Sequence, residues 1–168
     1  MVILNNLKNK KGFMSIYVIV MLAVLIPIMF FLTIDLPYMM RMNRTLKSAL
    51  DNATSTAITY LNEDKISQGV LEIDVNEANK IVKKVIQEYF YLNDDLTAND
   101  DSLIDGTPKV EIQVINNPTG QQINTPNGGT VIKNPSIVVY AEFPVKTKFS
   151  GITKTIKHTS VAQVRFKK

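Results

Sequence analysis

The feature that most constrains this chain is an uncharged, apolar run at residues 13–34, which reads FMSIYVIVMLAVLIPIMFFLTI. As an α-helix these 22 residues would extend about 33 Å, and the hydrocarbon core of a bilayer is about 30 Å thick. A buried core helix would need covering protein on every side, and the rest of this 168-residue chain is short and often polar. The run therefore predicts a transmembrane helix, within which Pro27 should kink or loosen the backbone.

A secretory signal peptide is the nearest alternative, because three lysines precede the run. The apolar core of a signal peptide is usually about 7–15 residues long and is followed by small residues at a cleavage site. This run is longer and ends in Thr33-Ile34-Asp35. The preceding lysines lie closer to the run than the basic residues after it, and Asp35 marks its far end, which favours a cytoplasmic N-terminus.

The formal net charge of +4 is unevenly distributed along the chain. The segment 1–34 carries only positive charge, residues 35–106 are acidic overall, and residues 107–168 are basic overall. Because an acidic middle offsets the basic ends, nucleic acid is not an expected partner. The chain contains no cysteine, which excludes disulfides, thiolate metal sites and cysteine nucleophiles.

Two helices are predicted after the apolar run. The first has a thin, alanine-rich stripe at three- and four-residue spacing, which packs either on the chain's own sheet or on a neighbouring subunit. Asp74 followed by Glu77 has the spacing of a capping box and predicts the start of the second helix, whose apolar face should pack on a sheet. The stripe of the first helix is Leu46, Ala49, Leu50, Ala53, Ala57, Tyr60 and Leu61, and that of the second is Ala78, Ile81, Val82, Val85, Ile86, Tyr89 and Phe90.

Five aspartates and no basic residue lie between positions 93 and 106. Clustered carboxylates can bind calcium, but the regular spacing of an EF-hand loop, with its glycine and closing glutamate, is missing. A solvated acidic loop is therefore favoured over an ion site. These residues are Asp94, Asp95, Asp100, Asp101 and Asp105.

The C-terminal part predicts antiparallel strands. Residues 109–116 alternate between apolar and polar side chains, and residues 117–130 are rich in Pro, Gly and Asn, as in a long loop or a hairpin. Two β-rich runs, 136–149 and 152–166, flank Ser150-Gly151 and predict a tight hairpin. Pro144 predicts a bulge or an edge position in the first run.

Four lysines crowd this hairpin: Lys146, Lys148, Lys154 and Lys157. Lysines on an exposed sheet edge commonly prevent strand-to-strand aggregation, and that interpretation is favoured over a site for an anionic partner. The single histidine, His158, is expected on a surface strand. No nucleophile, metal or dinucleotide motif accompanies it, so we expect neither an enzyme nor a cofactor.

The order of these features resembles the type IV pilin-like proteins, and among them the TadE/TadG-like minor pilins or pseudopilins of tight-adherence (Flp) pili. A basic leader ends in Lys10-Lys11-Gly12-Phe13, and a proline-bearing span ends in Thr33-Ile34-Asp35. Residues 44–53 (RTLKSALDNA) are similar to the family's basic residue, leucine and alanine-rich run with an aspartate. The resemblance covers about the first 60 residues and, loosely, the last 30 or so of the chain.

The resemblance implies cleavage between Gly12 and Phe13 by a prepilin peptidase, and packing of membrane helices at Tyr17, Pro27 and Asp35. Tyr17 would be the fifth mature residue, where pilins usually carry a glutamate. That carboxylate is thought to neutralise the N-terminal ammonium of a neighbouring subunit, whereas tyrosine offers a hydroxyl without charge at neutral pH. Because Tyr17 replaces the usual glutamate, the sequence leaves two alternatives: a subunit that is cleaved and polymerises, or a component that stays anchored in the membrane.

The sequence thus predicts an α+β protein whose transmembrane helix continues into an amphipathic helix, followed by a second helix and a small antiparallel sheet. Residues 1–12 would be a cytoplasmic leader, 13–34 the membrane span and 35–168 an extracytoplasmic domain. The expected function is that of a structural pilus subunit with pilin-like partners in a lipid membrane. The alternative is a membrane-tethered module that binds an anionic polymer or surface.

Overall fold

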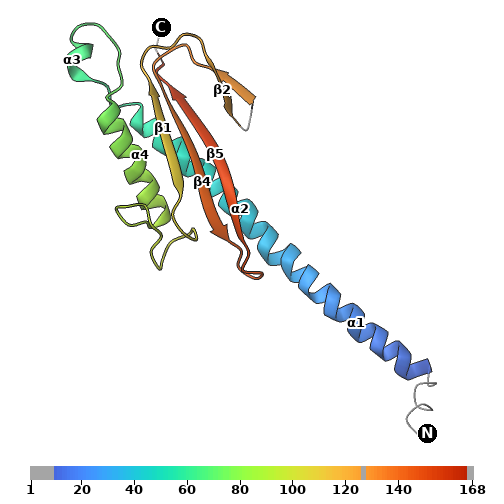
Figure 1. Ribbon diagram of the computed structural model, residues 1–168. Helices are drawn as coiled ribbons and strands as arrows, with labels where there is room; N and C mark the ends of the chain where they lie inside the picture. Colours follow the sequence, from blue (N-terminus) through green and yellow to red (C-terminus); the bar gives the residue numbers. More distant parts are fainter. Residues whose placement is uncertain (1–9, 126–127, 166–168) are drawn as a thin grey trace.

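The computed structural model describes residues 10–125 and 128–165. A continuous helical rod begins the described chain and consists of α1 (Lys10–Phe30), the π-helical segment η2 (Phe31–Asp35) and α2 (Leu36–Ala57). Figure 1 shows α1 projecting away from the remaining elements, whereas α2 lies along the sheet. Within the described residues, this rod provides the one helix that is long and apolar enough to cross a membrane, and 0% of its most apolar stretch is buried. The leader residues 1–9 lie outside the described residues.

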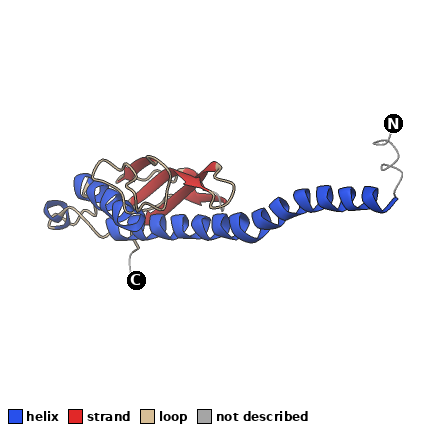
Figure 2. Ribbon diagram, turned by 90° about the horizontal axis from the view of Figure 1, so that it is seen from below, coloured by secondary structure: helices blue, strands red, loops and turns tan. Residues whose placement is uncertain are grey.

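The rod changes its helical geometry just after Pro27. A proline lacks the backbone donor for the carbonyl four residues before it, which weakens the helical ladder there. The helix stays α-helical to Phe30 and then widens into η2. Figure 2 shows the rod bending between its projecting part and the part under the sheet. The loosening expected near Pro27 therefore lies in the turn after it, as a π-helical segment.

The helix α2 uses its alanine-rich stripe inside the domain. Its buried side chains recur at three- and four-residue spacing, and α2 packs on β4, β5 and α4. Of the two alternatives, packing on the chain's own sheet is therefore the one observed. The predicted continuation of the stripe through Tyr60 and Leu61 is wrong, because the helix ends at Ala57 and Tyr60 is exposed. The buried residues are Met42, Leu46, Ala49, Leu50, Ala53, Thr54 and Ala57.

The helix α4 (Val75–Phe90) begins as the sequence predicts. The Asp74 carboxylate accepts hydrogen bonds from the backbone N–H groups of Asn76 at 2.9 Å and Glu77 at 3.1 Å. The reciprocal half of the capping box is replaced, since the N–H of Asp74 donates to the carbonyl of Tyr60 at 3.0 Å. A single turn, α3 (Glu63–Ile66), precedes this helix.

The apolar face of α4 packs mainly on α2, and this corrects the expectation that it simply covers the sheet. The sheet is narrow, and α2 already lies against its central and edge strands. The end of α4 does reach the sheet, where the Phe90 and Phe143 rings lie 5.1 Å apart between centroids. The fully buried residues of this face are Ala78, Val82, Ile86 and Phe90.

The main sheet has three antiparallel strands in the order β1 (Lys109–Ile115), β4 (Ser136–Lys146) and β5 (Thr153–Gln163). β4 is the central strand, with Val139 opposite both Ile112 and Ser160. The predicted hairpin in the segment 117–130 is present as β2 (Gln122–Thr125) and β3 (Gly128–Val131). This small hairpin contributes to a second apolar cluster, on Val138 and Ile132, separate from the main core. The α+β class and the order of elements are those predicted.

Pro144 lies in β4 without a bulge, opposite Thr155 in a continuous register. The prediction of a bulge at Pro144 is therefore wrong, whereas the alternative prediction, an edge position, is correct for this part of the strand. Pairing with β1 ends at Lys109 opposite Glu142, so β4 has a strand on only one side at Pro144. The carbonyl of Pro144 instead accepts the N–H of Asp105 at 2.7 Å.

Candidate functional site

The carboxylate of Asp35 lies buried at the point where the projecting helix enters the domain. Asp35 ends η2 and is 0% exposed. One carboxylate oxygen accepts the backbone N–H of Phe149 at 2.7 Å, and the other accepts that of Ser150 at 2.9 Å. Both donors belong to residues 147–152, which we call the hairpin loop because they connect β4 to β5. Asp35 thus joins the end of the rod to the loop.

This contact explains why the hairpin is less tight than predicted. The strands end at Lys146 and begin again at Thr153, so the predicted two-residue turn at Ser150-Gly151 is a six-residue loop. The N–H groups of Phe149 and Ser150 point to Asp35 instead of pairing across the hairpin. Part of the second β-rich run, at residue 166, lies outside the described residues.

The surroundings of Asp35 favour its charged form. Burial by itself would raise the pKa of this carboxyl group, but hydrogen bonds from Phe149, Ser150 and Lys148 act in the opposite direction. The net result is a pKa below the ordinary value of an aspartate. A charged carboxylate makes stronger hydrogen bonds to backbone amides than a neutral one does, so the loop is held most firmly when Asp35 is ionised.

Two ring contacts accompany the carboxylate. The rings of Phe30 and Phe149 are stacked, with centroids 5.0 Å apart and an interplanar angle of 22°. The ammonium of Lys148 lies 5.4 Å from the centroid of the Tyr38 ring, within the range of a cation–π interaction. The loop therefore contacts the rod on both sides of Asp35.

The loop is also ordered by its own hydrogen bonds. The hydroxyl of Thr147 lies 2.7 Å from that of Ser150 and accepts the N–H of Ile152 at 2.8 Å. The N–H of Thr147 donates to the carbonyl of Ile152 at 3.0 Å. These bonds set the shape of the loop, while Asp35 sets its position on the rod.

A second polar connection joins α2 to β5 farther along the rod. The hydroxyl of Ser160 donates to the carboxylate of Asp51 at 2.6 Å and lies 2.9 Å from the buried hydroxyl of Thr54. His158 was expected on the surface, but its ring is half-buried, with Nε2 3.0 Å from the side-chain oxygen of Asn43. Burial lowers the pKa of His158, and the hydrogen bond to the carbonyl of Asn43 partly opposes this effect.

The four hairpin lysines do not form one uniform site. Lys157 forms an ion pair with Glu142 at 2.5 Å on the outer part of the sheet. Lys148 lies over the Tyr38 ring, whereas Lys146 and Lys154 belong to the strand ends next to the hairpin loop. Lys146, Lys148 and Lys154 thus belong to the loop or to the strand ends beside it, and Lys157 is part of the sheet's own cross-strand pairing.

The residues to which the resemblance assigned processing and helix packing lie along α1 and η2. The backbone of Gly12 and Phe13 is helical, within the first turn of α1. Tyr17 is 62% exposed on the projecting helix. Of the three positions expected to pack membrane helices, Asp35 contacts the chain's own domain through the hairpin loop.

The acidic segment 93–106 contains no group of three or more potential metal ligands within the described residues. Its five aspartates are exposed, as expected for a solvated loop. Two of them make structural contacts: Asp95 accepts the N–H of Thr97 at 2.9 Å, and Asp105 accepts the hydroxyl of Thr153 at 2.7 Å.

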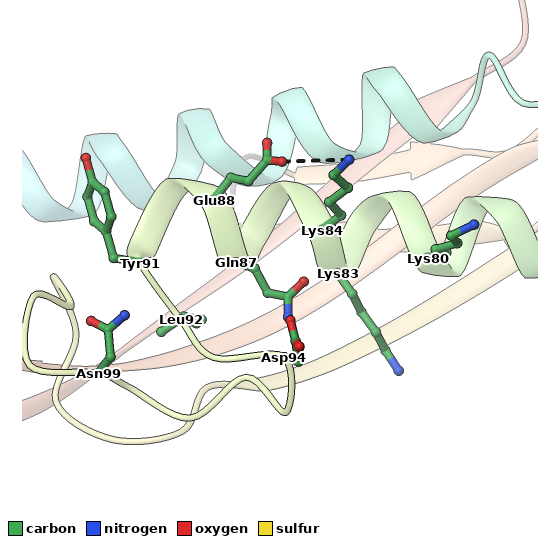
Figure 3. Close-up of a pocket in the computed structure, with 9 residues that line it drawn as sticks. All are labelled: Lys80, Lys83, Lys84, Gln87, Glu88, Tyr91, Leu92, Asp94 and Asn99. Carbon is green, nitrogen blue, oxygen red and sulfur yellow. Dashed lines mark ion pairs between the residues drawn. The ribbon is translucent and has the colours of Figure 1, made fainter.

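An open hollow beside the end of α4 is lined by lysines and polar side chains (Figure 3). Figure 3 shows Lys80, Lys83 and Lys84 projecting in different directions, with Lys84 paired to Glu88 at 3.9 Å. The lysines are exposed and do not converge on one point, so this hollow lacks the arrangement of a built binding site.

Comparison of the chain with protein-family models, with curated proteins and with solved structures found no match. The functional argument therefore rests on the sequence and on the geometry described above.

Sequence reasoning missed Phe149 and Ser150 as partners of Asp35, and Asn43 as the partner of His158. Their local sequence carries no signal for these contacts, because each partner lies more than a hundred residues away along the chain. The unusual placement of an acid directly after an apolar run at Asp35 was the available signal that this residue needed a partner.

Proposed function

We propose that this protein is a structural subunit, a minor pilin or pseudopilin, of a Tad/Flp-type pilus or pilus-like secretion apparatus. The observation that supports the proposal best is the continuous helical rod. Its exposed apolar part passes without a break into an amphipathic part that packs beneath an antiparallel sheet. A subunit with this shape has an apolar stem for the membrane or a fibre core and a folded head for the outer surface.

In this function the rod and the head have separate tasks. Residues 13–34 would hold the subunit in the bilayer, with the N-terminus cytoplasmic, and would pack against other pilin helices. The head, which begins at Asp35, would lie outside the cytoplasm. Asp35 would fix the angle between the two parts, because it joins the end of the stem to the hairpin loop. No catalytic step is required.

The test is intact mass and N-terminal sequencing of the full chain, recovered from membranes of cells that carry a matching prepilin peptidase. We expect a chain that begins at Phe13 and co-purifies with other pilin-like subunits. The control is Gly12→Leu, which changes the residue before the expected cut and should leave the leader attached. A wild-type chain that keeps its leader and purifies without pilin-like partners would contradict the proposal.

The alternative, a tethered module that binds an anionic polymer, has weaker support from the geometry. It would need the hairpin lysines to act together, but Lys157 is paired with Glu142 and Lys148 lies on the Tyr38 ring. Salt-sensitive binding of the full chain to an anionic polymer, without pilin-like partners, would favour this alternative.

A further inference from the structure

One side of the hairpin loop reaches the level of the predicted membrane span, while the other side contacts the rod beyond Asp35. Phe149 stacks on Phe30, with 5.0 Å between ring centroids. Phe30 precedes Ile34, the last residue of the predicted span, by about 6 Å along a helix that rises 1.5 Å per residue. If residues 13–34 cross a bilayer, the ring of Phe149 is therefore at the depth of the last turn of that span.

The side chains at this level are apolar and exposed. Phe149 is 49% exposed and Ile152 is 61% exposed, although both belong to a loop of a folded domain. Beside them, Phe30 and Phe31 on the rod are 44% and 47% exposed. An exposed patch of this kind on a chain with a membrane span is suited to contact with lipid.

The loop cannot easily turn away from this position. The Asp35 carboxylate holds the N–H groups of Phe149 and Ser150, and Thr147 closes the loop through Ile152. The rigid arrangement orders the loop in advance, so insertion of its apolar side chains costs little additional conformational entropy.

Two exposed lysines, Lys146 and Lys154, belong to the strand ends next to the apolar tip, while the ammonium of Lys148 lies over the Tyr38 ring. Lysine side chains near the end of a span can lie along apolar surface while the ammonium reaches the headgroup phosphates. Aromatic and aliphatic side chains with nearby lysines form the composition expected at a membrane interface.

We propose that the hairpin loop is a second membrane contact of this protein. Phe149 and Ile152 enter the interfacial zone of the leaflet on the side of the folded domain, and the exposed strand-end lysines, Lys146 and Lys154, reach the lipid phosphates. The domain is thereby held at the bilayer surface at two points, the rod and the loop. This inference depends on the membrane span and is independent of the pilus function.

The absence of tryptophan from the chain gives a direct test. The variant Phe149→Trp would carry the sole tryptophan of the full chain. The variant protein is reconstituted into vesicles of phosphatidylcholine and phosphatidylglycerol that contain lipid brominated high on the acyl chain. We expect blue-shifted emission and quenching of about twofold or more, as for an aromatic ring at the interface. Ile152→Trp provides a second reporter that leaves the Phe30–Phe149 stacking in place.

Two further variants serve as controls. Tyr60→Trp places the reporter after the far end of α2, about 30 Å or more beyond Asp35 at 1.5 Å per residue, and should not be quenched. Leu22→Trp, in the middle of the span, should be quenched by lipid brominated deep in the acyl chain and reports insertion of the rod.

The outcomes separate the alternatives. Quenching at position 22 without quenching at 149 and 152 would leave the span intact and overturn the proposal. A reporter at 149 that neither brominated lipid nor aqueous acrylamide quenches would be covered by protein, which also overturns it. Absence of quenching at position 22 would remove the span and the loop contact together. The proposal is supported if 22, 149 and 152 are quenched and 60 is not.

Discussion

A carboxylate next to an apolar helix has to be hydrated or compensated, because burying an uncompensated charge is costly. Asp35 is compensated by two backbone N–H groups from a loop far away in the sequence. The contact therefore compensates the buried charge and also links two segments that are far apart in the sequence. At the scale of single residues, this one side chain joins the end of the projecting helix to the hairpin loop.

We predict that Asp35→Asn lowers the thermal unfolding midpoint of the full chain in nonionic detergent by several degrees. The amide keeps one oxygen acceptor, but it loses the charge and places an NH2 group against a backbone donor. Thermal unfolding followed by circular dichroism measures the effect. Asp94→Asn, an exposed aspartate in the acidic loop, is the matched control and should leave the midpoint unchanged. Equal midpoints for both variants would show that the Asp35 contact contributes nothing to stability.

Acidification should destabilise the fold in a range where His158 titrates. Burial lowers the pKa of His158 in the folded protein, and nearby Lys47 lowers it further, against opposing effects of Asn43 and Asp51. The unfolded chain then binds more protons, so stability is complete above the unfolded pKa of about 6.5 and falls as the pH drops through it.

The measurement is the unfolding midpoint of the full chain between about pH 7.5 and pH 5.5, a range that brackets the ordinary histidine pKa. His158→Gln, which keeps an N–H donor for Asn43 but does not titrate, should show a smaller decrease. A decrease of the same size in the variant would assign the acid sensitivity to other groups. Below this range, Asp35 adds a further loss, because its folded pKa is lowered and its hydrogen bonds weaken on protonation.

At the scale of elements, one helical rod combines two environments. Leu22 is 48% exposed on α1, whereas Leu46 is 0% exposed on α2. The periodicity of the sequence separates them, because residues 13–34 are apolar all round and the later part has one apolar stripe. A leucine is therefore exposed in the projecting half of the rod and buried in the half that packs on the domain.

We predict that Leu46→Ala costs about 2–5 kcal/mol of unfolding free energy, because it leaves a cavity between α2 and its neighbours. Leu22→Ala on the projecting part should change the unfolding free energy by no more than about 0.5 kcal/mol, since its side chain contacts no packed core. Denaturant unfolding of both variants in the same detergent gives the comparison. Similar costs at both positions would contradict the division of the rod into an exposed and a packed half.

At the scale of the whole molecule, charge is separated along the chain. The segment 35–106 is acidic overall and the segment 107–168 is basic overall. Among the residues that the structure describes, there are only three ion pairs. We hypothesise that the acidic and basic surfaces meet between neighbouring subunits, in keeping with the proposed structural role.

This hypothesis predicts weaker association of the full chain at high salt. Screening shortens the range of charge interactions from about 10 Å at 0.1 M salt to about 3 Å at 1 M. Sedimentation of the protein in nonionic detergent at the two salt concentrations measures the change. An unchanged association state would indicate that apolar helix contacts, and not the charged surfaces, join the subunits.

The sequence predicted those parts of the structure that depend on short-range patterns. The uncharged run predicted the long apolar helix that projects from the domain, because length and composition alone decide whether a helix can cross a membrane. The Asp74 cap and the alternation of residues 109–116 likewise depend on neighbours within a few residues. Errors arose where an element meets a distant partner, as in the packing of α4 on α2 and the length of the hairpin loop.

The sequence by itself thus determined the α+β class, the order of the elements and the division of the chain into an apolar stem and a folded head. Only the tertiary structure decided that Asp35 holds the hairpin loop, that Phe149 stacks on Phe30, and that His158 is half-buried against Asn43. The physical reason is range. Helix and strand periodicity repeat within a few residues, whereas these contacts join groups more than a hundred residues apart, brought together by the packing of the sheet on the rod.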